Sequence, residues 1–343
     1  MTVRLKPLAS QIIVITGATS GIGLTTARAA CAKGAKLVLA ARDSEALDRL
    51  AGELRAAGGD ALAVPTDVGV HEEVAALGAA AVRRHGRVDT WVNNAGVSIF
   101  GRNQDVPLED QHKLFQTNFW GVVHGSLVAL DLMKEGGGAI INLGSEVSDR
   151  AVPLQGMYSA SKHAVKGYTD SLRMEIEKDG APISVTLVKP AGIDTMFLGH
   201  ARNYMSNEPE LPAPLYAPEL VADAILYAAE HPRRDIFVGG AAKLVSLEGQ
   251  AMPRMLDKFM NLMMFRQQQK DQPSAPDRVD ALYRPNGMAL RQRQGGHRSK
   301  TRERSAYTYL TTRGKPLALS LLVGGALLAA WKINRGNGAR RRQ

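Results

Sequence analysis

The chain has 343 residues, an apolar fraction of 45% and a single cysteine, Cys31. This composition is typical of a globular core, and one cysteine excludes an intrachain disulfide. The net charge of +10 is concentrated at the end, because 13 Lys and Arg face one acid from Met288 onwards, while the preceding 287 residues hold 30 against 32. A nearly neutral body argues against a nucleic-acid-binding enzyme body, whereas the basic tail could meet an anionic surface.

The first elements predict a dinucleotide site. Met1 to Ser10 lacks the pattern of a signal peptide, so the enzyme body is expected on the cytoplasmic side. Gln11 to Thr16 predicts a buried strand, and a glycine-rich turn and a helix ending at Lys33 follow it. Such a helix offers free amides and a positive dipole end to phosphates. The spacing Gly-x-x-x-Gly-x-Gly differs from the usual fingerprint, so a plain strand-to-helix turn is the alternative.

The second strand, Lys36 to Ala41, predicts the coenzyme. Arg42 and Asp43 follow it. In this architecture an acid at this point binds the ribose 2′-hydroxyl, whereas an arginine accommodates a 2′-phosphate. Arg42 therefore favours NADP over NAD. The alternative is that Arg42 is a solvated charge and Asp43 contacts the ribose.

Strands and helices alternate along the rest of the body. The expected strands are Ala61 to Pro65, Asp89 to Val92, a fifth ending at Ser145, Pro182 to Val188, and Asp235 to Val238. The expected helices begin at Ser44, as its cap, and then run over about Val70 to Arg84, Leu108 to Met133, Met157 to Lys178, and Glu219 to Glu230. This alternation predicts an α/β fold with a doubly wound parallel sheet of the Rossmann type. The ligand crevice is then expected at the carboxyl ends of the strands.

Tyr158 and Lys162 are four residues apart and share one face of a helix. An ammonium near a phenol favours the phenolate, so we expect a lowered Tyr158 pKa and a role as general acid/base. The Ser145 hydroxyl, at a strand end, could hydrogen-bond the same substrate oxygen. The alternative is a surface Tyr and Lys on an amphipathic helix. Asn118, in the middle of a helix, is a poor helix former that needs solvent or a specific partner.

Together these motifs resemble the short-chain dehydrogenase/reductase family. The resemblance rests on the segment Thr16 to Gly23, on Asn93-Asn94-Ala95-Gly96, and on Asn118, Ser145, Tyr158 and Lys162, over about Leu8 to Gly240. It implies an oxidoreductase that transfers a hydride between NADP(H) and a carbonyl or alcohol. Tyr158 would be the acid/base, Ser145 would hold the substrate oxygen, Lys162 would bind the nicotinamide ribose, and Asn118 would support a proton relay. A catalytically silent dinucleotide-binding regulator or scaffold is the alternative.

The resemblance also implies the cofactor contacts. They are Gly17, Thr19, Ser20, Gly21, Ile22, Gly23, Arg42, Asp67, Val68, Asn94, Ala95, Gly96, Tyr158, Lys162, Pro190 and Thr195. Asp67 could instead, or also, cap the next helix. Ala191 departs from the family's usual Pro-Gly. The histidines show no metal-site spacing, so no metal is expected.

A substrate lid is implied for the irregular stretch from Ala191 to Pro218. Met196, Phe197, Leu198 and Tyr204 would form its apolar inner face. This predicts a small-molecule substrate of lipid-like, steroid-like or aromatic character. The resemblance further implies a homo-oligomer that assembles through the long helices.

Beyond the catalytic domain, placed at residues 1–245, three segments are expected. Residues 246–270 carry a Met-rich apolar stripe that predicts a helix, packed on the core or a partner or covering a substrate entrance. Residues 271–316 predict a basic linker, and residues 317–343 an apolar segment with a basic end. Leu317 to Trp331 is apolar on all sides, which predicts a membrane anchor or membrane-surface segment, with a helix packed on protein as the alternative.

Overall fold

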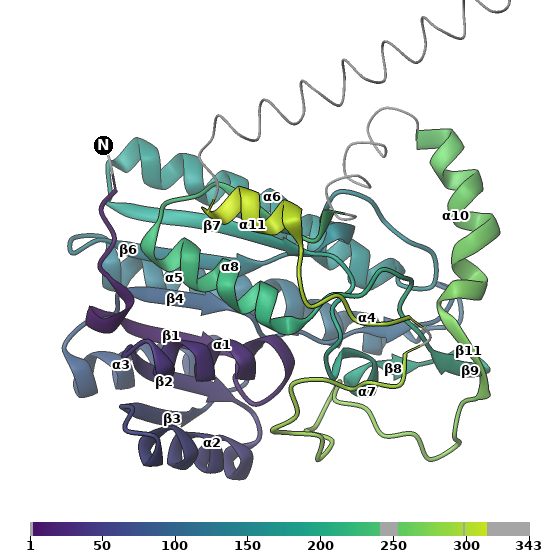
Figure 1. Cartoon of the computed structure of the whole chain (residues 1–343), viewed down its shortest axis with the longest axis horizontal. Coiled ribbons are helices and arrows are strands. Elements are labelled where there is room, and N and C mark those ends of the chain that lie inside the picture. Colours follow the sequence, from purple (N-terminus) through teal and green to yellow (C-terminus); the bar gives the residue numbers. More distant parts are fainter. Residues whose placement is uncertain (1–2, 241–252, 298, 314–343) are drawn as a thin grey trace, which may run out of the picture.

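A seven-stranded parallel sheet forms the centre of the computed structural model, which describes residues 3–240, 253–297 and 299–313 (Figure 1). The strand order is β10-β7-β6-β4-β1-β2-β3, and every pair runs parallel. The strands are β1 (Ile12–Thr16), β2 (Lys36–Ala41), β3 (Ala61–Pro65), β4 (Thr90–Asn93), β6 (Gly138–Leu143), β7 (Ile183–Pro190) and β10 (Asp235–Val238). The predicted doubly wound sheet is therefore confirmed, and each predicted strand is present to within a few residues at its ends.

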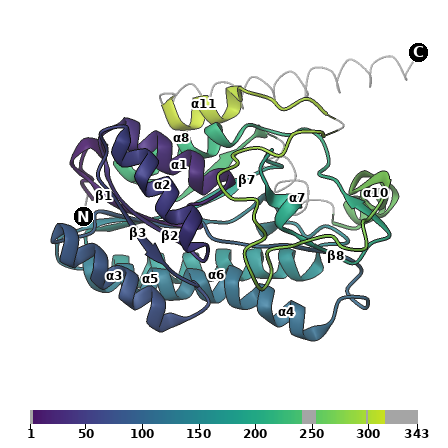
Figure 2. The ribbon, with the colours of Figure 1, turned by 90° about the horizontal axis from the view of Figure 1, so that it is seen from below.

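Helices cover both faces of the sheet (Figure 2). One layer holds α1 (Gly21–Ala32), α2 (Ser44–Ala56), α8 (Pro218–Glu230) and α11 (Ala306–Arg313), and the other holds α3 (His71–His85), α4 (Leu108–Phe115), α5 (Gly121–Met133) and α6 (Gly156–Asp179). The strands are apolar runs because both of their faces are buried, as all five residues of β1 are. The strand order reverses between β1 and β4, which opens a crevice at the carboxyl ends.

Two local predictions on these helices need correction. The expected single helix from Leu108 to Met133 contains a π-helical turn, Gln116–Trp120, which widens the backbone at Asn118. The α2 helix is capped by Asp43, whose carboxylate accepts a hydrogen bond from the Ala46 amide at 3.0 Å, and not by Ser44. A 3.6-residue pattern does not distinguish an α turn from a π turn, and either Asp43 or Ser44 has a suitable capping oxygen.

Asp67 does not cap the helix that follows it. Helix α3 begins after Val70 without a side-chain cap. The Asp67 carboxylate instead accepts from the Gly69 amide at 2.9 Å and lies 3.3 Å from the Lys113 ammonium. It therefore stabilises the turn beside the crevice.

The stretch after β7 is less irregular than expected. It contains α7 (Phe197–His200), β8 (Arg202–Asn203) and β9 (Asn207–Pro209). Strand β8 pairs with β5 (Ile99–Phe100), and β9 pairs with β11 (Gln269–Pro273).

The described part of the predicted basic linker, residues 271–297 and 299–313, contains regular elements. Strand β11 joins β9, and α11 packs against β10. Between these elements the chain crosses the body beside α7, where residues 278–297, called the C-terminal strap below, lie along the crevice (Figures 1 and 2). The polar composition of this segment gives no periodic signal, because its contacts join it to residues that lie far away in the sequence.

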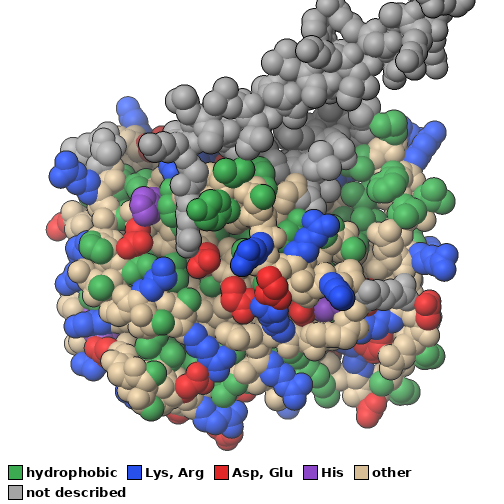
Figure 3. Space-filling model, in the orientation of Figure 1, with side chains coloured by type: hydrophobic (Ala, Val, Ile, Leu, Met, Phe, Trp, Pro, Cys, Tyr) green, Lys and Arg blue, Asp and Glu red, His purple; other side chains and the backbone are tan. Residues whose placement is uncertain are grey.

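Helix α10 (Pro253–Gln267) is amphipathic, as predicted. Leu256 and Met260 are buried, whereas Met255, Phe259 and Leu262 are exposed and add to the apolar surface on the α10 side of the molecule (Figure 3). The apolar segment Leu317 to Trp331 lies outside the described residues, so membrane association stays a prediction. Among the residues that the structure describes, no helix is long and apolar enough to cross a membrane.

Candidate active site

Two cavities lie end to end at the carboxyl edge of the sheet and share Gly96. The catalytic cavity is about 240 Å³, and the nucleotide cavity is about 120 Å³. Predicted site residues that line the catalytic cavity are Ile22, Asn94, Gly96, Ser145, Tyr158, Lys162, Pro190 and Thr195. Those that line the nucleotide cavity are Gly17, Thr19, Ser20, Arg42, Asp67, Val68, Ala95 and Gly96. Only Gly21, Gly23 and Asn118 of the predicted set line neither cavity.

Helix α6 carries Tyr158 and Lys162 into the catalytic cavity. Lys162 is buried, and its Nζ donates to the Leu143 carbonyl at 2.8 Å. The same nitrogen lies 5.8 Å from the centre of the Tyr158 ring. Burial lowers the pKa of Lys162 to about 8, because a low-dielectric site disfavours the charged ammonium.

The chain's own groups do not lower the pKa of Tyr158, contrary to expectation. Burial raises it, a hydrogen bond with Ser145 opposes the rise, and the charge of Glu146 adds to it. The reason is geometric: Lys162 hydrogen-bonds the Leu143 carbonyl, and desolvation of the phenolate dominates. Tyr158 by itself is therefore well suited to keep and donate a proton.

Ser145 is fixed where β6 ends and a short 3-10 turn, Glu146–Ser148, begins. Its Oγ accepts from the Val147 amide at 3.3 Å, and its own amide donates to the Ser148 Oγ at 3.1 Å. This capping box holds the hydroxyl at the mouth of the strand, on the same cavity as Tyr158.

Glu146 is a cavity residue that sequence reasoning missed. It lines the catalytic cavity, and no hydrogen-bond partner for its carboxylate occurs among the described residues. Burial raises the pKa of Glu146 to about 7. Its position next to Ser145 was the available signal.

Asn118 holds the loop that follows β4. Its side chain is fully buried, accepts from the Val97 amide at 2.8 Å, and donates to the Val97 carbonyl at 2.9 Å and the Ser161 Oγ at 3.2 Å. The amide thus ties the Gly96-Val97 backbone to α6. A proton relay through Asn118 stays a prediction.

The glycine-rich turn brings the backbone close to the crevice. Gly17 has a φ of 65°, and a Cβ there would lie 2.8 Å from the Ala95 Cα. A Cβ on Gly23 would lie 2.1 Å from the Gly17 carbonyl oxygen, so larger residues at either position would force α1 away. The Asn94 side chain secures the turn by donating to the Thr16 carbonyl at 2.9 Å.

Arg42 is not a solvated charge. Arg42 lines the nucleotide cavity. Its guanidinium donates to two carbonyls of the C-terminal strap, that of Ala281 and, at 3.1 Å, that of Leu282. The Asp43 carboxylate is engaged as the α2 cap. Arg42 is therefore placed where it could pair with a phosphate, but in this structure two strap carbonyls accept hydrogen bonds from it.

The walls of the catalytic cavity are largely apolar. Phe197 packs edge-on against Tyr158, with 5.3 Å between ring centres. Residues 211–214 add a second wall, and Met260 and Met264 of α10 add a third. Helix α10 thus covers the cavity, which was one of the two roles proposed for the Met-rich stripe.

The predicted inner face of the lid is only partly correct. Of the four residues named for it, only Phe197 lines the catalytic cavity. Leu198 packs in a separate cluster with Phe100, and the Tyr204 hydroxyl donates to Asp110. Sequence alone did not tell which side of the lid each residue would face.

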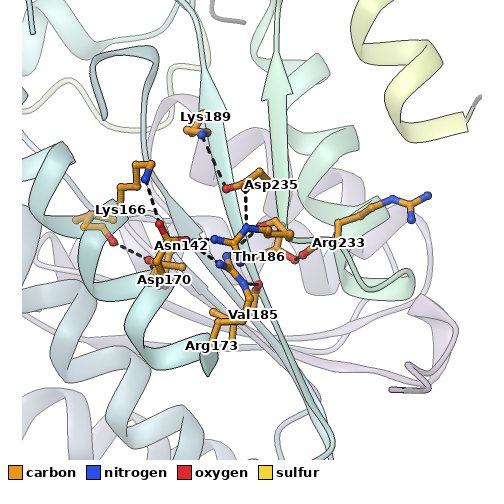
Figure 4. Close-up of polar contacts among 12 residues, drawn as sticks. Asn142, Lys166, Asp170, Arg173, Val185, Thr186, Lys189, Arg233 and Asp235 are labelled. Carbon is orange, nitrogen blue, oxygen red and sulfur yellow. Dashed lines mark hydrogen bonds and ion pairs between the residues drawn. The ribbon is translucent and has the colours of Figure 1, made fainter. Parts of the chain in front are cut away.

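A polar network fixes the catalytic helix to the sheet (Figure 4). Arg173 of α6 is buried and donates to the Val185 carbonyl of β7 at 3.0 Å and to Asp170 at 2.8 Å. It also reaches the Arg234 carbonyl at 3.1 Å, just before β10. Tyr158 and Lys162 are therefore carried by a helix that is anchored at its far end.

The fold, the paired cavities and the positions of Ser145, Tyr158 and Lys162 together define an oxidoreductase of the short-chain dehydrogenase family, to which this chain belongs. The family model described as short chain dehydrogenase matches residues 11–205. An uncharacterized oxidoreductase of Bacillus subtilis (strain 168), YxnA, is 46% identical over 331 residues, which cover 96% of this chain and 91% of that protein. Because the match covers 96% of this chain, it includes residues of the C-terminal strap.

Two other proteins add detail. The ketoacyl reductase HetN of Nostoc sp. (strain PCC 7120) is 30% identical over 259 residues, covering 74% of this chain and 88% of HetN. An alcohol dehydrogenase from the archaeon Thermococcus sibiricus, solved with 5-hydroxy-NADP, superposes with a TM-score of 0.59 at 27% identity. It covers 66% of this chain and 95% of its own.

Proposed function

We propose that this protein is an NADP(H)-dependent oxidoreductase that interconverts a carbonyl and an alcohol on an apolar small molecule. The observation that carries the proposal is the convergence of Ser145, Tyr158 and Lys162 on one apolar cavity that joins a second cavity lined by the glycine-rich turn and Arg42. The NADP analogue in the Thermococcus sibiricus enzyme supports the choice of coenzyme.

In this proposal each polar group has a defined role. Ser145 holds the substrate oxygen, and Tyr158 donates a proton to it in reduction or removes one in oxidation. Lys162 binds the nicotinamide ribose, and its charge assists the tyrosine when proton transfer leaves a phenolate. A bound nicotinamide supplies or accepts the hydride at the substrate carbon. Asn118 fixes the loop beside Lys162 and supports a relay that returns the proton.

The apolar walls favour the substrate class. Phe197, the 211–214 segment and the two α10 methionines present apolar surface to the cavity. A lipid-like, steroid-like or aromatic carbonyl would bury its body there, with its oxygen at Ser145 and Tyr158. The alternative, a regulator that binds dinucleotide without turnover, is less well supported because such a protein does not need these three groups together.

The test is the Tyr158→Phe variant. We expect kcat to fall at least about 1,000-fold, because the proton donor is lost while the ring and its packing remain. NADPH affinity should change by less than about threefold. The measurement is nicotinamide absorbance during incubation with NADPH and a panel of apolar ketones and aldehydes, with NADPH binding followed by fluorescence.

Each outcome separates the two functions. Near wild-type kcat in Tyr158→Phe would refute the assigned acid/base. If wild-type protein binds NADPH but oxidises it with no carbonyl in the panel, the regulator becomes the better description. If NADH binds more tightly than NADPH, the assignment of Arg42 to a 2′-phosphate is wrong.

A further inference from the structure

The C-terminal strap forms one wall of the nucleotide cavity. Six of its residues line that cavity opposite the glycine-rich turn and the end of β2: Ala281, Pro285, Asn286, Gly287, Met288 and Ala289. The strap reaches the turn directly, since the Leu290 amide donates to the Thr19 carbonyl at 2.7 Å. A segment more than 230 residues after the β2 end thus closes a site built by the first elements of the chain.

Strap carbonyls occupy the donors that a dinucleotide phosphate would use. Arg42 donates to the carbonyls of Ala281 and Leu282. The Gly21 amide, first in α1 and free of any partner within that helix, donates to the Arg291 carbonyl at 3.0 Å. A carbonyl oxygen and a phosphate oxygen cannot accept from the same N–H at the same position. The bound strap and a bound phosphate therefore exclude each other at the Gly21 amide, and at Arg42 they compete for two of the five guanidinium N–H donors.

The size of the nucleotide cavity leads to the same conclusion. With the strap in place the cavity is about 120 Å³. Small-molecule and cofactor sites usually enclose about 300–1,000 Å³. With the strap in this position, the space beside Arg42 is therefore small for the adenosine half of a dinucleotide.

Side-chain anchors hold the strap against the lid side of the crevice. Asp280 lies 2.9 Å from the Arg202 guanidinium, and the Tyr283 hydroxyl donates to Asp110 at 2.8 Å. Arg278 lies 3.1 Å from Glu208 and also donates to two backbone carbonyls of the α7 region. None of Arg278, Asp280 and Tyr283 lines either cavity, so these anchors can be altered without touching the proposed cofactor contacts.

A further anchor lies at the end of the strap. His297 is buried between two carboxylates, with Nδ1 2.8 Å from Glu210 and Nε2 3.1 Å from Asp194. Asp194 directly precedes Thr195, so the strap and the proposed nicotinamide contact share a support.

We propose that the strap is an internal competitor of the dinucleotide: it occupies the Arg42 and Gly21 donors when the site is closed, and cofactor binds after it lifts. This inference rests on the proposed function for the identity of the ligand. The apparent dissociation constant equals the intrinsic one divided by the open fraction. Weakening an anchor raises the open fraction and therefore tightens binding.

The test measures NADPH and NADH binding to the full chain by fluorescence titration and stopped flow. We expect Tyr283→Phe to lower the Kd for NADPH about threefold and Arg278→Ala to lower it about tenfold. The change in Kd should come from the association rate. The Kd for NADH should fall by the same factor, because the open fraction divides the intrinsic dissociation constant of both nucleotides equally. The matched control is Arg284→Ala, which removes a positive charge from an exposed strap residue that makes no hydrogen bond or ion pair within the described part of the structure.

Unchanged or weaker binding of both nucleotides in folded Tyr283→Phe and Arg278→Ala would overturn the proposal, since the strap would then be a neutral or stabilising wall. The same gain in Arg284→Ala would also overturn it, because loss of charge alone would explain the effect. These readouts need no turnover. A protein that fails to oxidise NADPH thus contradicts the proposed function without affecting the binding result.

Discussion

Glu146 places a carboxyl group in the catalytic cavity beside the Ser145 and Tyr158 hydroxyls. Its pKa is raised by burial to about 7. Because an unfolded chain releases this proton near pH 4.5, the folded state binds more protons between about pH 4.5 and 7. Stability should therefore fall as the pH rises through this window and then level off. Lys162, with its pKa lowered to about 8, affects the slope only above that pH.

We predict that Glu146→Gln is more stable than the wild type at pH 7.5 by about 2–5 °C in Tm, and that the two proteins converge at pH 4.5. The glutamine keeps the shape of the side chain and removes its ionisation. Thermal unfolding at several pH values is the measurement. Two curves that stay parallel from pH 4.5 to 7.5 would show that Glu146 titrates normally.

At the scale of elements, α6 depends on Arg173 for its attachment to β7 and to the segment before β10. Arg173→Met should lower the free energy of unfolding by about 2–3 kcal/mol, because the buried Val185 carbonyl and the partly buried Arg234 carbonyl lose a charged donor. The control is Lys166→Met on the same helix, whose ammonium pairs with Asp170 at 3.0 Å in a partly exposed position and should cost less than about 1 kcal/mol. Urea unfolding checks both. Equal losses would mean that the buried network adds nothing specific.

The strands and the site were predictable because their signals are local. Residues 12–16 and 138–143 form apolar runs whose entire length is buried. Tyr158, Lys162 and Ser145 line one cavity because a helix turn and a strand end place them together. The π turn at Asn118 left no such mark, since it changes hydrogen bonding without changing the residue pattern.

The strap was missed for a different physical reason. Its contacts with Arg42 and the glycine-rich turn use backbone groups, namely the carbonyls of Ala281, Leu282 and Arg291 and the Leu290 amide, and such groups carry no sequence signal. Its side-chain anchors, such as Tyr283 to Asp110, join positions 173 residues apart. A polar, glycine-containing composition therefore predicts a linker, although backbone carbonyls of this segment accept hydrogen bonds from Arg42 and Gly21.

At the scale of the whole molecule, apolar side chains remain exposed on the layer of α4, α5 and α6. Leu127 of α5 is 46% exposed and Met174 of α6 is 61% exposed. We predict a homo-oligomer that buries this layer. The double change Leu127→Glu and Met174→Glu should shift the mass measured by light scattering toward the monomer.

The matched control for this prediction is Met255→Glu on α10, which introduces a charge at a residue that is 60% exposed on a different side of the molecule. It should leave the mass unchanged. A wild-type protein that is monomeric at all concentrations contradicts the prediction. A loss of assembly only in Met255→Glu would assign the interface to α10 instead.

The distance along the chain between Arg42 and its strap partners has a consequence during synthesis. Arg42 and Leu282 are 240 positions apart, which at about 5–20 residues per second corresponds to about 10–50 s on the ribosome. The glycine-rich turn and the β2 end therefore leave the ribosome well before the segment that covers them. A newly made chain could meet its cofactor during this interval without competition, so its first binding event need not pass through the barrier that the finished protein imposes.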